Sequence, residues 1–200
     1  MALTICNCIL RIKDQLGSAF SSAELIFEPR KSQLNTSDAL YINRPQKNTA
    51  SPGIVIQDLI YISKSVSPSS AITVAYTGGG TAGSEVVTVV GNAISVQIES
   101  GVSTATQVKT KVDALAAASA LVYCLVSGTG SNAQTTVSAT SLSDYYCYLP
   151  LSETTTNTQD SIFELNWNDG QNYNSIIFDP TQIPNQSYKD LSTSLTISRG

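Results

Sequence analysis

The sequence contains no histidine, and this absence removes several classes of chemistry. Ser-His-Asp triads and Cys-His nucleophile pairs use an imidazole as the general base, and many zinc sites use one as a ligand. None of these arrangements can be built from this chain. An enzyme of this sequence would have to work with paired carboxylates, so we expect a protein that is not an enzyme.

Charged residues are scarce, at 13% of the chain, against about a quarter in an average globular protein. Lys and Arg together number 11, Asp and Glu number 15, and the net charge is −4. Because basic residues are this few, they form no positive patch for a phosphate backbone, and we expect no nucleic-acid partner. Ser, Thr, Asn and Gln take the place of the charges, which predicts a polar, nearly neutral surface suited to protein–protein contact.

Long apolar runs are also missing. No stretch approaches the roughly 20 residues that a helix needs to cross a bilayer. The first ten residues, MALTICNCIL, lack the basic region and the cleavage pattern of a signal peptide. We therefore expect a soluble protein with no membrane partner, made in a cytoplasm.

The four cysteines give only a weak signal for a metal or a disulfide. Cys6 and Cys8 lie two residues apart in a run typical of a strand, so they share a face and cannot easily bridge each other. A C-x-C pair without a second pair nearby is poor evidence for zinc. The interpretation that we favour is small buried side chains at all four positions, including Cys124 and Cys147. A disulfide from Cys6 or Cys8 to Cys147, or a metal, remains an alternative.

A glycine-rich stretch has the spacing of a phosphate-binding loop. Gly78, Gly80 and Gly83 fit G-x-G-x-x-G directly after an apolar run. In a phosphate loop a helix must begin at these glycines, because its free N–H groups bind the anion. Here the β-branched run Val86–Val90 follows instead, which favours a strand. The acidic residue that normally follows about 20 positions later is missing as well.

The same stretch continues as a predicted β-hairpin. Ile94, Val96 and Ile98 alternate with polar residues, and Gly91-Asn92 separates this run from Val86–Val90. We therefore expect the glycines to form a flexible, exposed connection between strands that binds no nucleotide cofactor. On this interpretation, replacing Gly79 and Gly80 with Ser would leave stability nearly unchanged.

One helix is predicted, over residues 104–119. Thr104 and Gln107 form a capping box, and Val108, Val112 and Leu115 follow at helical spacing. The other periodic segments are predicted strands, residues 30–53 are a predicted loop, and residues 183–191 are a predicted loop or short helical turn. The strands are expected at residues 3–13, 23–29, 54–63, 71–76, 86–90, 93–99, 120–127, 135–141, 145–151, 161–167, 173–178 and 194–198.

The predicted fold class is mainly β, with a β-sandwich into which a small α+β domain is inserted. The Ser- and Pro-containing stretch Lys64–Ser70 is a linker by composition. Residues 1–66 and 144–200 share an aromatic and aliphatic alternation with no helix, and would form the sandwich. Residues 67–143 would form the insertion, with one helix packed on an antiparallel sheet.

Two parts of the sequence resemble known virion proteins. The run Arg11-Ile12-Lys13-Asp14, then Gly17, then AELIFEP over residues 23–29, resembles the opening of carboxypeptidase-regulatory-like (transthyretin-like) β-sandwiches of phage tail-fibre and adaptor proteins. Asp190-Leu191 falls where that family has its closing element. The stretch from TAGSEVVTVVGNAISVQIESG to TATQVKTKVDALAAASALV is similar to a module that recurs within phage virion proteins.

The resemblance implies a structural role in a bacteriophage virion, in the tail, baseplate or neck, with other virion proteins as partners. It also implies a homo-oligomer, and we favour a trimer. The predicted loop Arg30–Gly53 supports assembly, because Leu34, Leu40, Tyr41 and Ile42 would otherwise be exposed. Capsid decoration, carbohydrate-binding receptor recognition and an immunoglobulin-type adhesion module outside a virus are the alternatives.

Two alternative functions, a glycosidase and a carbohydrate-binding protein, would each depend on a further set of residues. A glycosidase would need a carboxylate pair, for which Asp160 with Glu164 or Glu153 could be proposed, but nothing sets their spacing. Sugar stacking would need exposed aromatic residues, whereas aromatic residues that alternate in strands are usually core or cross-strand pairs. The aromatic candidates are Tyr145, Tyr146, Tyr148, Trp167 and Tyr173. We assign no catalytic, cofactor or metal site.

Overall fold

The computed structural model describes residues 51–149, with the side chains of Cys147 and Leu149 excepted. Outside this range it describes only the backbones of strands. These are β1 (Leu3–Thr4), β2 (Asn7–Ile12), β3 (Glu24–Pro29), β4 (Gln46–Thr49), β13 (Thr154–Thr155), β14 (Phe163–Asn168), β15 (Tyr173–Phe178) and β16 (Tyr188–Asp190).

Most of the described residues are in strands, so the predicted mainly-β class with a small helical part is confirmed. The chain divides into two compact units, Ser51–Tyr145 and Met1–Ala50 with Tyr146–Gly200. The chain leaves the first unit near the start of β12 (Asp144–Leu149). The expected domain limits at residues 67 and 143 fall inside the unit Ser51–Tyr145.

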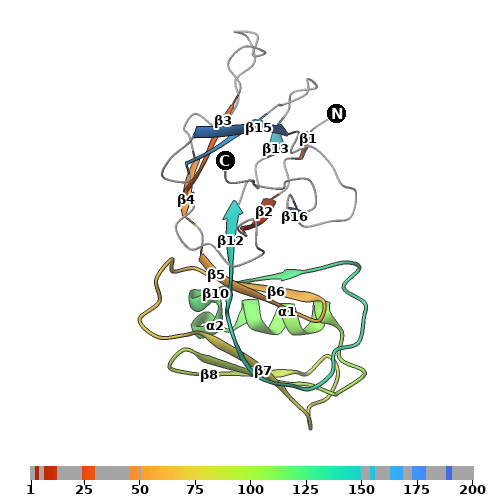
Figure 1. The fold of residues 1–200 in the computed structure, drawn as a ribbon. Helices are drawn as coiled ribbons and strands as arrows, with labels where there is room; N and C mark the ends of the chain where they lie inside the picture. The colour runs from red at the N-terminus through yellow and green to blue at the C-terminus, as the bar shows by residue number, and fades with distance from the viewer. Residues whose placement is uncertain are drawn as a thin grey trace. The chain divides into compact units, whose positions relative to one another are not determined.

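The unit Ser51–Tyr145 contains two sheets (Figure 1). In the first, β6 (Leu59–Ser63) pairs antiparallel with both β5 (Ser51–Ile56) and β10 (Val122–Val126). The second has the order β11-β7-β9-β8. Its strands are β7 (Thr73–Thr77), β8 (Val86–Val90), β9 (Ala93–Gln97) and β11 (Val137–Ser141). β7 and β9 are parallel, so this sheet is mixed and not antiparallel throughout as expected.

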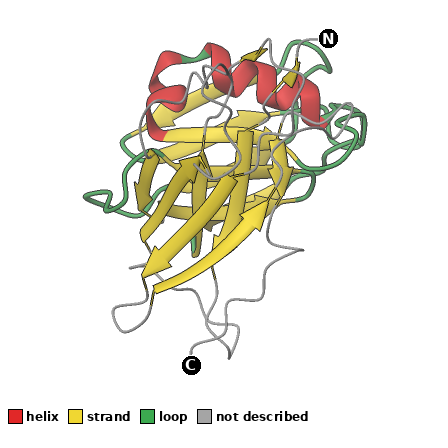
Figure 2. Ribbon diagram, turned by 90° about the horizontal axis from the view of Figure 1, so that it is seen from above, coloured by secondary structure: helices red, strands yellow, loops and turns green. Residues whose placement is uncertain are grey.

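Two short helices, α1 (Ala105–Ala114) and α2 (Ala116–Leu121), lie between these sheets in Figure 1 and are drawn in red in Figure 2. The capping box is confirmed, with Thr104 and Gln107 each bonded to the other's backbone N–H. The single helix expected over 104–119 is interrupted at Leu115, whose ψ of 110° is extended. Leu115 is partly buried and packs against the core.

One hydrophobic core joins both sheets and both helices. Leu59 and Tyr61 from β6 belong to the same buried cluster as Val74 from β7 and Val108 from α1. β6 is buried along its whole length and pairs with β10 over five residues. The hairpin β5–β6 is therefore part of the core of this unit, which explains why the unit begins at Ser51 and not at Ser67.

The expected single strand over 54–63 is a hairpin. Gln57 and Asp58 form the turn between β5 and β6, and Gln57 has a φ of 51°. The Gln57 side chain is bonded to the backbone N–H and C=O of Thr135, which holds this unusual residue in place. Periodicity could not indicate the turn, because both flanking strands are apolar and lack glycine or proline at the turn.

In the other unit, β14 lies between β3 and β15, all antiparallel, and β4 pairs with β3. The predicted hairpin of residues 161–167 and 173–178 is confirmed as β14–β15. The predicted loop over 30–53 was wrong in part, because β4 lies within it. The loop or short helical turn predicted over 183–191 was also wrong in part, because β16, parallel to β2, lies there. The expected strand 194–198 and the residues Leu34 to Ile42 lie outside the described residues.

The core contains a tyrosine pair that offers a test of its packing. The hydroxyls of Tyr61 and Tyr76 lie 2.8 Å apart, and both side chains are buried. Burial raises the pKa of both hydroxyls, with Cys124 adding to the increase, so each is a neutral partner. We predict that Tyr76→Phe destabilises the protein by about 1 kcal/mol, because the Tyr61 hydroxyl loses its main partner.

The double variant Tyr61→Phe/Tyr76→Phe should cost less than the sum of the two single variants, since it leaves no unpaired buried hydroxyl. Urea denaturation of the four proteins measures the coupling. Strictly additive costs would contradict a direct bond between the two hydroxyls.

Candidate functional site

Three loops meet at the start of α1, and in the described part of the chain they contain two candidate anion-binding features. The first feature is the glycine loop between β7 and β8, and the second is the N-terminus of α1 itself. Both present backbone N–H groups, which bind phosphates when they are free. The question is therefore whether these N–H groups have partners within the protein.

Four N–H groups of the glycine loop, those of Gly80, Ala82, Gly83 and Ser84, are bonded to the protein's own oxygens. Gly83 donates to Glu85 Oε1 at 2.8 Å and Ala82 donates to Glu99 Oε2 at 2.9 Å. Gly80 donates to the Ile98 carbonyl at 3.0 Å and Ser84 to the Thr81 carbonyl at 2.9 Å. Two carboxylates thus take the place that a phosphate would occupy, and their charge disfavours an anion there.

The Glu85 carboxylate is the buried centre of this arrangement, with only 4% of the residue exposed. Burial alone would raise its pKa, but hydrogen bonds from the Ser103 hydroxyl and from the N–H groups of Glu85 and Gly83, together with the Lys111 charge, lower it. Glu85 is therefore ionised at neutral pH. Its second oxygen, Oε2, has no hydrogen-bond partner in the part of the chain that the structure describes.

Ser103 connects the carboxylate to the segment before α1. Its hydroxyl donates to Glu85 Oε1 at 2.7 Å and accepts from the Glu99 N–H at 3.0 Å. Its carbonyl accepts from the Gln134 N–H at 2.7 Å. Gln134 is fully buried and its Nε2 donates to the Asn132 carbonyl, so the loop before β11 is tied to the same cluster.

The backbone N–H groups at the start of α1 are also bonded to oxygens of the chain itself. Thr104 caps the N–H of Gln107, while Ala105 and Thr106 donate to the carbonyls of Asn132 and Gly130. A Cβ on Gly130 would lie 2.4 Å from Thr106 Oγ1, and its φ is 76°. Glycine is required there because the loop must approach the helix closely. The described N–H donors at the helix start therefore point at the chain itself.

The glycine loop is not the tolerant connection that the sequence predicts. A Cβ on Gly80 would lie 2.8 Å from the backbone oxygen of Gln97, and Gly79 has a φ of 89°. The expectation that Ser would be accepted at both positions is therefore wrong. The predicted hairpin after the loop is confirmed: β8 and β9 pair antiparallel across Gly91-Asn92, and a strand rather than a helix follows the glycines.

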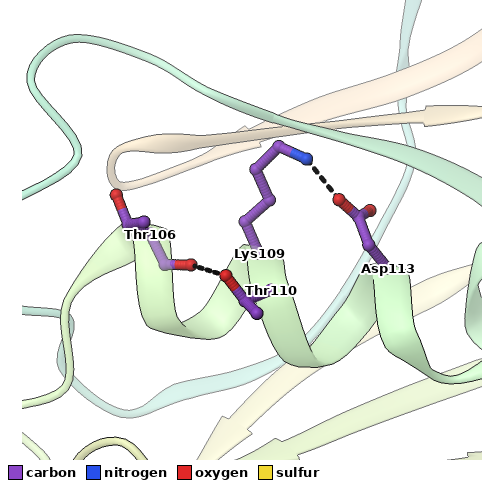
Figure 3. Close-up of polar contacts among 4 residues, drawn as sticks. All are labelled: Thr106, Lys109, Thr110 and Asp113. Atoms are coloured by element: carbon purple, nitrogen blue, oxygen red, sulfur yellow. Dashed lines mark hydrogen bonds and ion pairs between the residues drawn. The ribbon is translucent and has the colours of Figure 1, made fainter.

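Two charged side chains on α1, Lys109 and Asp113, are paired with each other. Figure 3 shows Lys109 paired with Asp113 one turn later, and the Thr110 hydroxyl bonded to the Thr106 carbonyl at 2.8 Å. Among the described residues no group of three His, Cys, Asp or Glu side chains could hold a metal ion. No helix in the described part of the chain is long and apolar enough to cross a membrane.

Of the cysteine and aromatic candidates, three have described and buried side chains. Cys124 is free on β10, and burial, with the nearby Asp113 charge, raises the pKa of its thiol to about 12. Tyr146 and Tyr148 are buried, which fits core packing better than sugar stacking, and Tyr145 is half-buried. The side chains of Cys6, Cys8 and Cys147 lie outside the described residues.

The carboxylate candidates are not brought together as a described pair. The backbone of Glu164 is on β14, opposite Glu28 on β3 and Ile177 on β15. Glu153 and Asp160 lie outside the described residues, as do the side chains of Glu164, Trp167 and Tyr173. The residues that sequence reasoning missed are Glu85, Glu99, Ser103 and Gln134, because no spacing rule brings three separate loops together.

Comparison of the chain with family models, curated proteins and solved structures finds no match.

We predict that Gly80→Ala destabilises the protein by about 1–3 kcal/mol, because the added carbon forces the backbone of Gln97 and Ile98 to move. Gly78→Ala is the matched control. Its added carbon would meet only Thr136 Cγ2 at 3.6 Å, an ordinary contact, so its effect should stay within about 0.5 kcal/mol. Thermal and urea unfolding measure both changes, and equal effects would contradict the close approach.

A second prediction concerns the Glu85 charge. Its folded pKa lies below the ordinary value of 4.5, so the stabilisation is present above that pH and is lost as the pH falls through the folded pKa. We predict that Glu85→Gln costs about 1–2 kcal/mol at pH 7, because neutral hydrogen bonds replace charge-assisted ones.

On acidification from pH 7 to pH 3, the Glu85→Gln variant should lose less free energy of unfolding than the wild type. Glu99→Gln is the control, because Glu99 is only half-buried and accepts a single loop N–H. If Glu85→Gln and the wild type lose the same stability on acidification, Glu85 is not the ionised anchor of the loop.

Proposed function

We propose that this protein is a structural component of a bacteriophage virion, a fibre or adaptor protein of the tail, baseplate or neck. It acts through protein–protein contacts, as a homo-oligomer and with other virion proteins, and carries out no catalysis. One contrast within the unit Ser51–Tyr145 carries the proposal. The buried carboxylate of Glu85 accepts hydrogen bonds from the chain itself, whereas the apolar side chains of Val86 and Val90 on β8 are exposed and available for contact with protein.

Several features of the sequence support the virion assignment. The stretch Arg11 to Pro29 and the stretch of residues 81–122 resemble parts of phage virion proteins. A chain in which only 13% of the residues are charged favours close contact with protein over capture of ionic ligands. The expected threefold symmetry depends on residues 30–45, which lie outside the described residues, and stays a prediction.

The alternatives differ in what they require. Capsid decoration needs the same kind of surface and differs only in location on the particle. Carbohydrate recognition needs exposed aromatic faces, and the burial of Tyr146 and Tyr148 removes two of the five candidates. The tail, baseplate or neck assignment is therefore the one that we retain.

The test is the location of the chain on particles. An epitope-tagged copy at the native locus should sediment with intact particles in a density gradient, and gold labelling should place it at the tail, baseplate or neck. Labelling over the capsid would favour decoration instead. A chain that remains entirely at the top of the gradient, although the particles assemble normally, would overturn the virion assignment.

A further inference from the structure

Strand β8 is an open edge of its sheet. It is the last strand in the order β11-β7-β9-β8, and it pairs only with β9 among the described strands. Val86 and Val90 are 51% and 80% exposed. The run VVTVV contains no charge and no proline, the features that normally protect an edge strand from pairing.

The hairpin turn determines which backbone groups face outward. Val90 and Ala93 flank a two-residue turn, with Gly91 at a φ of 59°, so they form the hydrogen-bonded pair that closes it. Bonded and non-bonded pairs alternate along an antiparallel ladder. Residues 86, 88 and 90 therefore bond to β9, and the N–H and C=O groups of Val87 and Val89 point to the open edge.

These outward groups match a second copy of the same strand. The sequence VVTVV reads the same in both directions, so an antiparallel pair centred on Thr88 is related by a two-fold axis. Val87 then lies opposite Val89 of the other copy, and both exchange hydrogen bonds. On the outer face Val86 lies opposite Val90 of the other copy, and Thr88 lies opposite Thr88.

The residues around β8 favour pairing at this edge of the sheet over pairing at the opposite edge, which is β11. The pairing of β11 with β7 contains a register shift between Val137 and Thr140, so the opposite edge does not offer a regular ladder. Helix α2 lies beside β8 and exposes the short side chains Ala116, Ala117 and Ala120, which leave room for a neighbouring copy. No like charges meet in the proposed ladder.

We infer that two copies of this chain associate through β8, forming a continuous eight-stranded sheet from two four-stranded ones. A single five-residue strand pair lies below the roughly 1,200–2,000 Å² of a stable interface. The dimer therefore dissociates on dilution and strengthens where copies are concentrated on a particle. The inference deepens the proposed assembly role and rests on it for its biological setting, while the contact itself can be measured on the isolated chain.

The test of the dimer uses the proposed strand register, in which Val86 of one copy lies opposite Val90 of the other. Sedimentation equilibrium of the full chain over micromolar to millimolar concentrations should show a monomer–dimer equilibrium. Val86→Lys/Val90→Lys should raise the dissociation constant by about tenfold or more, because two like-charged pairs replace two valine pairs. Val86→Lys/Val90→Glu should restore the dimer, because each introduced lysine then lies opposite an introduced glutamate of the other copy.

Val55→Lys/Val102→Lys is the matched control, since both valines are exposed to a similar degree, 44% and 50%, and neither is on β8. It should leave the dimer unchanged, and far-ultraviolet circular dichroism should show all variants folded. A wild-type chain that is monomeric at every concentration or that forms only trimers would overturn the inference, as would a charge swap that fails to rescue. Binding of a different protein at β8 without self-association would also overturn it.

These outcomes are separate from those of the proposed function. A chain found on particles but monomeric when free refutes only the pairing of β8. A chain that dimerises through β8 but does not occur on particles refutes only the virion role.

Discussion

The ionised carboxylate of Glu85 is the constraint on which the three loops at the start of α1 depend. It accepts hydrogen bonds from Gly83 and Ser103, and these two residues belong to different loops. Ser103 in turn holds the backbone of Glu99 and Gln134. A buried charge is costly unless such donors surround it, so the loops can occupy only the arrangement that supplies them.

This arrangement explains how a loop with the spacing of a nucleotide-binding motif can donate its N–H groups to the protein's own carboxylates. The glycines are present for a related physical reason, which is close approach of one backbone to another. At Gly80 the neighbour is the backbone of Gln97 and Ile98, and at Gly130 it is Thr106. In a phosphate loop the same freedom brings the backbone close to a ligand. The motif alone therefore cannot distinguish an external anion from an internal carboxylate.

Local signals in the sequence predicted the local structure well. The hairpin across Gly91-Asn92 and the capping box of Thr104 and Gln107 each depend on residues within a few positions of one another. The Gln57-Asp58 turn could not be found in this way, because the side chain that holds it bonds to Thr135, which is 78 residues away. The parallel pairing of β7 with β9 and the position of β16 beside β2 likewise depend on contacts distant in the sequence. The same limit applies to the cluster around Glu85.

Amide spectra of the full chain test the central claim, that the loop donors are occupied by the protein's own carboxylates. In ¹⁵N–¹H correlation spectra the Gly83 amide proton should resonate downfield at pH 7 and move upfield as the pH falls below 4.5, following protonation of Glu85. Millimolar phosphate or ATP at pH 7 should leave the Ala82 and Gly83 signals unchanged. A saturable shift of both amides on addition of phosphate, with no response to acidification, would contradict the account.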